Sequence, residues 1–143
     1  MMSDTVTNFL KLGRHFRVNL SRGDVVLIEP DETMNGFIKK WAQSLGASVV
    51  SFQNIRQVEK FEASPRCVIV GLEGCSIFEL KKFLSVIDRE HPVTVTVVYS
   101  SNKAVITEIQ NLLPRVTTIL KGEGLKHLLF SLDAEMRVEG IVA

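Results

Sequence analysis

The sequence predicts a doubly wound α/β sandwich, in which a five-stranded parallel sheet lies between two helical layers. After Gly23, short apolar runs rich in Val, Ile or Thr alternate with patterns of helical spacing. Runs of this length suit strands that are buried on both faces, and strict alternation favours parallel strands joined by right-handed helical crossovers. The chain has 143 residues, of which 45% are hydrophobic. That size and composition fit one packed domain.

Five apolar runs are the predicted strands, and each is followed by a predicted helix. The strands span residues 25–28, 47–52, 67–70, 93–98 and 116–120. The first helix starts after Asp31, which suits an N-cap, and ends at Gly46. Its apolar stripe consists of Met34, Phe37, Ile38, Trp41 and Leu45.

The other helices are marked by their apolar spacing and by their end signals. Ile55 and Val58 indicate a short second helix that ends before Pro65. Ser76 and Glu79 form a capping-box pattern at the start of the third helix. The stripe of the fourth is Val105, Ile109 and Leu112, and that of the fifth is Leu125, Leu128, Leu129 and Leu132.

Residues 24–136 make up the predicted domain. Residues 1–23 form an N-terminal extension in which basic side chains stand among apolar ones. This pattern fits a solvated or capping segment, and it also fits a contact with a partner or a membrane surface. Residues 137–143 are a C-terminal tail or the start of a linker.

The charge balance and the cysteine content exclude several classes of protein. With 17 basic and 16 acidic residues the net charge is +1, so nothing directs the whole surface toward nucleic acid. Two cysteines provide no disulfide framework, which fits a reducing compartment. No apolar run approaches the ~20 residues of a membrane span. We therefore expect a cytoplasmic protein without a membrane span and without direct contacts to nucleic acid.

Ligands of such sheets gather at the carboxyl ends of the strands, here residues 29–33, 71–76, 99–103 and 121–124. The first of these loops opens with Glu29, Pro30 and Asp31, and Lys121 directly follows the fifth strand. Together with five β/α units over residues 24–136, this pattern resembles a response-regulator receiver domain, which has a flavodoxin-like (βα)5 fold. The separations from Glu29 to Gly71 and from Tyr99 to Lys121 are close to those between the matching family positions.

The resemblance implies a receiver that has lost its chemistry. Receivers transfer a phosphoryl group to an aspartate and need acids for Mg²⁺, a hydroxyl after the fourth strand and a lysine after the fifth. At the matching positions this chain has Glu29 for the first acid but Pro30 for the second, and Gly71 for the phosphoacceptor. Tyr99 stands at the hydroxyl position, with Ser100 beside it. Glu29 and Lys121 are the two matches that remain at these positions.

Three neighbouring residues have expectations of their own. Thr118 occupies the family's aromatic switch position. Asp31 is expected to cap the first helix instead of binding metal. Lys121 is expected either to pair with Glu29 or to bind a ligand. Glu73, two positions after Gly71, lies outside the geometry that in-line transfer requires. We expect no metal site, no cofactor and no enzymatic activity.

These observations predict a pseudo-receiver that is not phosphorylated and acts as a regulatory protein-interaction or dimerisation module in bacterial signalling. A transcription activator or a cyclic-dinucleotide enzyme would fit as its output domain. The alternative is a small-molecule sensor that uses the vacated pocket around Glu29, Gly71, Ser100 and Lys121. The family carries its output mainly on the face formed by the last two helices and the strand between them. The candidate contacts on this face are Ile106, Leu113, Thr118 and either Leu128 or Phe130.

Overall fold

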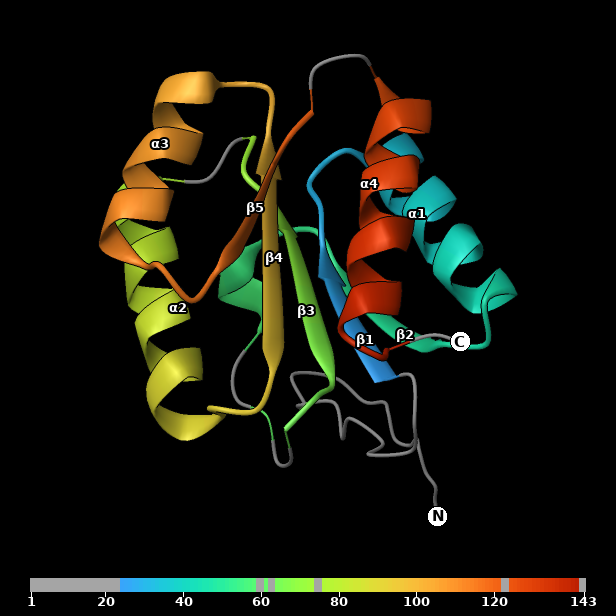
Figure 1. Ribbon diagram of the computed structural model, residues 1–143, viewed down its shortest axis with the longest axis horizontal. Coiled ribbons are helices and arrows are strands. Elements are labelled where there is room, and N and C mark those ends of the chain that lie inside the picture. The colour runs from blue at the N-terminus through green and yellow to red at the C-terminus, as the bar shows by residue number, and fades with distance from the viewer. Residues whose placement is uncertain (1–23, 59–60, 62–63, 74–75, 122–123, 142–143) are drawn as a thin grey trace.

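The chain forms a parallel five-stranded sheet between two layers of helices (Figure 1). This computed structural model describes residues 24–58, 61, 64–73, 76–121 and 124–141. The strands occur in the order β2-β1-β3-β4-β5, and every pairing is parallel. Their bounds are β1 Asp24–Ile28, β2 Ser48–Phe52, β3 Cys67–Gly71, β4 Val95–Ser100 and β5 Thr117–Leu120. The predicted doubly wound sandwich with five parallel strands is confirmed, and its strand order is the flavodoxin-like one.

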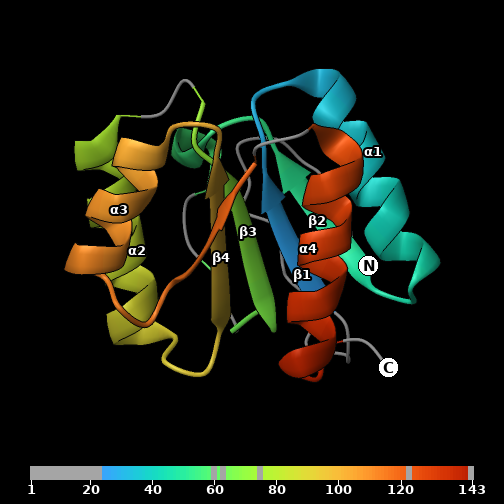
Figure 2. The ribbon, with the colours of Figure 1, turned by 45° about the horizontal axis from the view of Figure 1, so that its top comes forward.

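Four α-helices cover the sheet within the described residues. They are α1 Glu32–Ser44, α2 Ile77–Glu90, α3 Lys103–Leu112 and α4 Leu125–Val138. Figures 1 and 2 show α1 and α4 on one face of the sheet, and α2 and α3 on the other. Each face has its own core because strand side chains alternate. Leu27 and Ile69 pack toward α1 and α4, whereas Val68 and Val70 pack toward α2 and α3.

The predicted helix starts at Asp31 and Ser76 are confirmed. The carboxylate of Asp31 accepts hydrogen bonds from the backbone N–H groups of Thr33 (2.9 Å) and Met34 (3.1 Å). The hydroxyl of Ser76 accepts one from the N–H of Glu79 (3.1 Å). Each cap satisfies backbone donors that the first helical turn leaves without a partner.

The prediction of a second α-helix is wrong. Between β2 and β3 the described residues contain only the 3₁₀ helix η2 (Ile55–Gln57). The side chain of Gln57 accepts hydrogen bonds from the N–H groups of Gln53 (2.6 Å) and Asn54 (3.3 Å), which closes a single turn. Val58 is already extended, with φ −90° and ψ 106°. The described part of this connection therefore contains a single turn where an α-helix was expected.

Strand β4 and helix α4 differ most from the expected boundaries. β4 begins at Val95 instead of residue 93, because a turn in which the N–H of Thr94 donates to the carbonyl of His91 (3.0 Å) precedes it. Helix α4 continues to Val138, and Ile141 beyond it is buried in the core of the α1 and α4 face. The segment predicted as a tail, residues 137–143, thus begins inside α4. The division into an extension, a domain and a tail stays a prediction.

Candidate functional site

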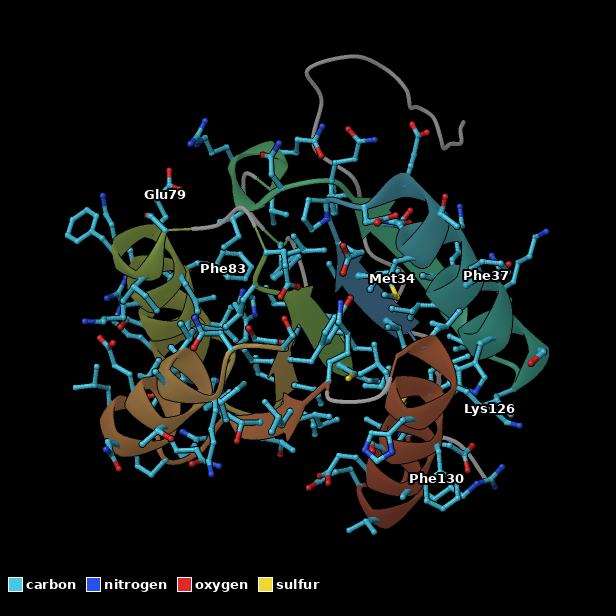
Figure 3. All side chains as sticks on the ribbon, turned by 90° about the horizontal axis from the view of Figure 1, so that it is seen from above. Met34, Phe37, Glu79, Phe83, Lys126 and Phe130 are labelled. Carbon is cyan, nitrogen blue, oxygen red and sulfur yellow. The ribbon has the colours of Figure 1, made fainter. Side chains whose placement is uncertain are left out.

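The candidate site lies at the carboxyl edge of the sheet, where all five strands end. This edge is at the top of Figure 1, and Figure 3 shows the molecule from that side. We call Glu29, Gly71 and Tyr99 the closed half of the edge. Glu73, Ser100 and Lys121 are its open half. The two halves meet at β4, where Tyr99 and Ser100 are neighbours in sequence.

The closed half is a row of three residues across β1, β3 and β4. Gly71 pairs in register with Tyr99, and Ile28 pairs with Val70, so Glu29 comes beside Gly71 on the other side. Because side chains alternate along a strand, residues in one such row project to the same face. Gly71 has no side chain. The hydroxyl of Tyr99 therefore reaches across β3 and donates a hydrogen bond to the carboxylate of Glu29.

This arrangement requires a glycine at the middle of the row. A Cβ added to Gly71 would lie 2.7 Å from the hydroxyl oxygen of Tyr99 and 2.8 Å from its Cζ, and it would also overlap the Glu29 carboxylate. Interiors packed to crystal-like density tolerate such overlap only if neighbours move. The space that a side chain at position 71 would need is already filled.

Glu29 is buried, and its carboxylate accepts two hydrogen bonds. The residue is 2% exposed, and its carboxylate accepts a hydrogen bond from the N–H of Asp31 (2.7 Å) as well as the one from Tyr99. Burial raises the pKa of Glu29, although both hydrogen bonds and the charge of Lys121 oppose the rise. Burial and the neighbouring Glu29 also raise the pKa of Tyr99. The phenol therefore keeps its proton and acts as the donor.

The two other residues of the first loop do not belong to this row. Pro30 is exposed, and Asp31 directs its carboxylate at the start of α1, as expected. The carboxylates of Glu29 and Asp31 therefore do not form a pair for a divalent cation. Among the described residues, no group of three or more His, Cys, Asp and Glu side chains is placed to hold a metal ion.

The open half is organised by Glu73. Its Oε2 accepts hydrogen bonds from the N–H and the hydroxyl of Ser101, both 3.3 Å, and from the hydroxyl of Ser100 (3.5 Å). Its Oε1 lies 3.8 Å from Nζ of Lys121. The side chain of Glu73 is 43% exposed, so water reaches this cluster. One carboxylate thus links the segments that follow β3, β4 and β5.

The structure corrects the expected partner of Lys121. Among the described side chains its ion pair is with Glu73, not with Glu29. Sequence reasoning considered Glu73 only as a nucleophile and missed these contacts. The strand order would have predicted the contacts of Glu73 with the segment after β4. Because β3 is adjacent to β4, the loops that follow them must lie side by side.

The interaction face stays a prediction, but the exposure of its candidate residues is known. Of the two alternatives on α4, Phe130 is 76% exposed and points outward in Figure 3, whereas the expectation that Ile106 is exposed is wrong. Ile106 is 6% exposed and Leu128 is 0% exposed. The buried positions of α3 are Ile106 and Ile109, so the helix is rotated relative to the stripe expected from Leu112, which is 50% exposed.

The remaining candidates on this face lie between these extremes. Leu113 caps α3 and is half-buried. Thr118 on β5 is half-buried too, and its hydroxyl accepts a hydrogen bond from the side-chain amide of Gln110 (2.7 Å). Exposed apolar side chains do occur on this part of the chain, at Leu112, Leu120, Phe130 and Val138.

The hollow beside Gly71 is small. It has a volume of roughly 280 Å³ and is lined by Ile28, Pro30, Gly71, Glu73 and residues from the segment after β2. Neither Glu29 nor Lys121 lines it. Pockets for small organic ligands usually measure about 300–1,000 Å³. Directly beside Gly71, the space that the sequence suggested for a ligand is filled by Glu29 and Tyr99, whereas Ser100 and Glu73 line a separate hollow of roughly 280 Å³.

Solved structures share this architecture. A response regulator from Thermotoga maritima matches with a TM-score of 0.57 and 20% identity, over 79% of this chain and 96% of that one. The signal receiver domain of an HD domain-containing protein from Pseudomonas fluorescens Pf-5 matches with a TM-score of 0.61 and 13% identity, over 81% of this chain and 95% of that one. The chain has a receiver-like fold.

The likeness concerns the fold alone. A de novo designed Rossmann 2x3 fold protein also matches, with a TM-score of 0.61 and 16% identity, over 82% of this chain and 91% of that one. No model of a protein family and no curated protein matches the sequence. Function must therefore be argued from the site. Within the described part of this receiver-like chain, no helix is long and apolar enough to cross a membrane.

Proposed function

We propose that this chain is a pseudo-receiver, a regulatory domain of bacterial signalling that takes no phosphoryl group and works by binding a protein partner or a second copy of itself. One observation carries the proposal. The position at the end of β3 that would need a nucleophilic carboxylate is Gly71, and the space beside it is filled by Glu29 and Tyr99. A phosphoryl group has neither an acceptor nor room there.

The open half supports the same proposal. In the family that the sequence resembles, a phosphoryl group meets a hydroxyl after the fourth strand and a lysine after the fifth. Here the carboxylate of Glu73 contacts Ser100 and Lys121 instead. A resident anion at this place holds the loops after β3, β4 and β5 together without any reaction. We infer that the domain keeps one arrangement of this edge and signals by association.

The exposed apolar side chains of α3, β5 and α4 are the proposed contact surface. Leu112, Leu120, Phe130 and Val138 are each at least 40% exposed. We infer that these side chains take part in one contact at the β5 edge of the sheet, and symmetric dimers are the commonest assemblies. An output domain or another signalling protein would use the same face.

Intact-mass spectrometry after incubation with Mg²⁺ and acetyl phosphate tests the first part of the proposal. The wild-type protein is expected to gain no phosphoryl group, and Gly71→Asp is expected to gain none either, because Pro30 and Asp31 provide no further metal ligand. A catalytically intact receiver in the same reaction serves as the positive control. A stoichiometric, base-labile adduct of one phosphoryl group on the wild type would contradict the proposal.

Sedimentation velocity tests the second part. Phe130→Glu places a charge on the proposed surface, and Phe78→Glu is the matched control because Phe78 is 71% exposed on α2, on the other face of the sheet. We expect the wild type and Phe78→Glu to dimerise with rising concentration, and Phe130→Glu to remain monomeric. A dimer that survives Phe130→Glu places the contact elsewhere, and a wild type that stays monomeric removes self-association.

A further inference from the structure

An apolar groove runs along α2 next to η2. It has a volume of roughly 640 Å³, and its apolar lining includes Ile55, Val58, Phe61, Phe83 and Val86. Figure 3 shows Phe83 on the inner side of α2. In its described part the connection from β2 to β3 forms one 3₁₀ turn at the side of this groove. Ile55, Val58 and Phe83 are half-buried there.

The dimensions of the groove suit a helix with one apolar face. Its lining extends from Glu79 in the first turn of α2 to His91 at the C-cap. Helix α2 has 14 residues and is therefore about 21 Å long. An amphipathic helix of similar length, laid beside α2, would bury its apolar residues at the i, i+3, i+4 and i+7 positions.

We propose that residues 1–23 of this chain dock in the groove as that helix. Their sequence carries an apolar stripe at helical spacing, formed by Val6, Phe9, Leu10, Phe16 and Leu20. From Val6 to Leu20 a helix would be roughly 22 Å long, which matches α2. Gly13 and Arg17 also lie on the stripe, and the glycine costs a helix about 1 kcal/mol relative to Ala. A segment of this kind gains its helical structure from a surface that covers the stripe.

Charged groups of both signs border the groove. Glu79 pairs with Arg56 (2.9 Å) and Glu90 pairs with Arg89 (3.4 Å), and Lys82 also lies on the rim. In the segment, Lys11 and Arg14 fall outside the apolar stripe, and the long side chain of Arg17 can carry its charge from the stripe to the rim. Burial of the stripe therefore supplies the affinity.

The segment joins the fold close to one end of the groove. It enters at Asp24, the first residue of β1, and Val25 pairs with Cys67 of the neighbouring strand. At the same edge, Ser64 shares a hydrogen bond with Nδ1 of His91 (2.7 Å), and the ring of Phe61 lies against that of His91. Adjacent strands are about 4.8 Å apart. A few residues after Leu20, at about 3.3 Å each when extended, suffice to reach this end.

Methyl NMR of the full-length protein tests the proposal from the side of the segment. Phe9→Asp/Leu10→Asp removes the centre of the stripe, and Thr7→Asp/Asn8→Asp adds the same charge on the opposite side of the predicted helix. We expect the stripe variant to shift the methyl signals of Val58 and Val86, and the control variant to leave them unchanged. The methyl signals of Val138, on α4, should be the same in all three proteins. If the methyl signals of Val58 and Val86 do not shift in the stripe variant, the proposal is overturned.

Trypsin cleavage of residues 11–22 tests it from the side of the groove. Val86 is 39% exposed in the groove, and Phe37 is 51% exposed on α1, on the other face of the sheet. We expect Val86→Asp to speed cleavage in the segment by roughly tenfold, and Phe37→Asp to leave the rate unchanged. Equal rates would overturn the proposal. Protection that is lost on dilution would also overturn it, because the segment would then occupy the groove of a second copy.

Discussion

The two halves of the carboxyl edge differ in how their carboxylates are held. In the closed half, Glu29 is buried and accepts hydrogen bonds from Tyr99 and from the backbone of Asp31. In the open half, Glu73 is partly exposed, and its Oε1 lies 3.8 Å from Nζ of Lys121. The closed half is therefore part of the core, whereas the open half is a surface cluster that joins loops. A change in the first should cost stability, and a change in the second should not.

The largest expected effect is that of Gly71→Asp. Its side chain has to enter space filled by Tyr99 and brings a second carboxylate beside buried Glu29. Overpacking with an unpaired buried charge should lower the free energy of unfolding by at least about 3 kcal/mol, measured by urea denaturation. Gly36→Asp is the control, because no atom lies within 4 Å of a Cβ at Gly36, and its effect should stay within about 0.5 kcal/mol. Equal effects of the two variants would contradict the close packing of Glu29 and Tyr99 around Gly71.

Tyr99→Phe is expected to have a smaller effect. It keeps the ring but removes the hydroxyl that donates to Glu29, which leaves a buried carboxyl with the Asp31 N–H as its remaining hydrogen-bond donor among the described contacts. Loss of a partner by a buried polar group costs about 1–3 kcal/mol. Urea denaturation at neutral pH measures this, and an unchanged midpoint would show that the hydroxyl contributes nothing to the closed half.

The dependence of stability on pH should identify Glu29. Its pKa in the folded protein lies above the ordinary value of 4.5, so between these two values the folded state binds more protons than the unfolded state. The free energy of unfolding should therefore decrease as the pH rises through this window. In the Glu29→Gln variant the amide at position 29 does not titrate. The stability of the wild type relative to Glu29→Gln should fall as the pH rises above 4.5, and a constant or increasing difference would contradict the assignment.

The smallest effect is expected in the open half. Glu73→Gln removes the ion pair with Lys121, but the two atoms are 3.8 Å apart and the glutamate side chain is 43% exposed. Partly exposed ion pairs contribute about 0.5 kcal/mol or less. Thermal denaturation in low and high salt checks this value. A loss comparable to that of Tyr99→Phe would make the open half structural as well.

The sequence predicted the architecture because local signals and the global fold agree here. Alternation of apolar runs with helical patterns predicts the parallel sheet, and Asp31 and Ser76 mark helix starts by chemistry that acts within one turn. The prediction of a short second α-helix was wrong because two apolar positions, Ile55 and Val58, are also compatible with a single 3₁₀ turn. The side chain of Gln57 closes that turn.

The sequence could predict which residues lie at the site, but not which of them contact one another. The absence of a carboxylate at Gly71 follows from the sequence directly. The contact between Tyr99 and Glu29 depends on the register of three strands, which apolar periodicity does not determine. The orientation of α3 is a similar case, since stripes through Ile106 or through Leu112 both satisfy helical spacing and the packing against the sheet selects Ile106.

The central claim is that Gly71 is a glycine because Glu29 and Tyr99 use the space above it. A double-mutant cycle in urea denaturation measures this directly, with Gly71→Ala and Tyr99→Leu as the two changes and Gly36→Ala as the control for backbone entropy. We predict that Gly71→Ala costs about 1–3 kcal/mol in the wild type and much less in Tyr99→Leu, while Gly36→Ala does not destabilise the protein. An unchanged stability of Gly71→Ala, or the same cost in both backgrounds, would contradict the account.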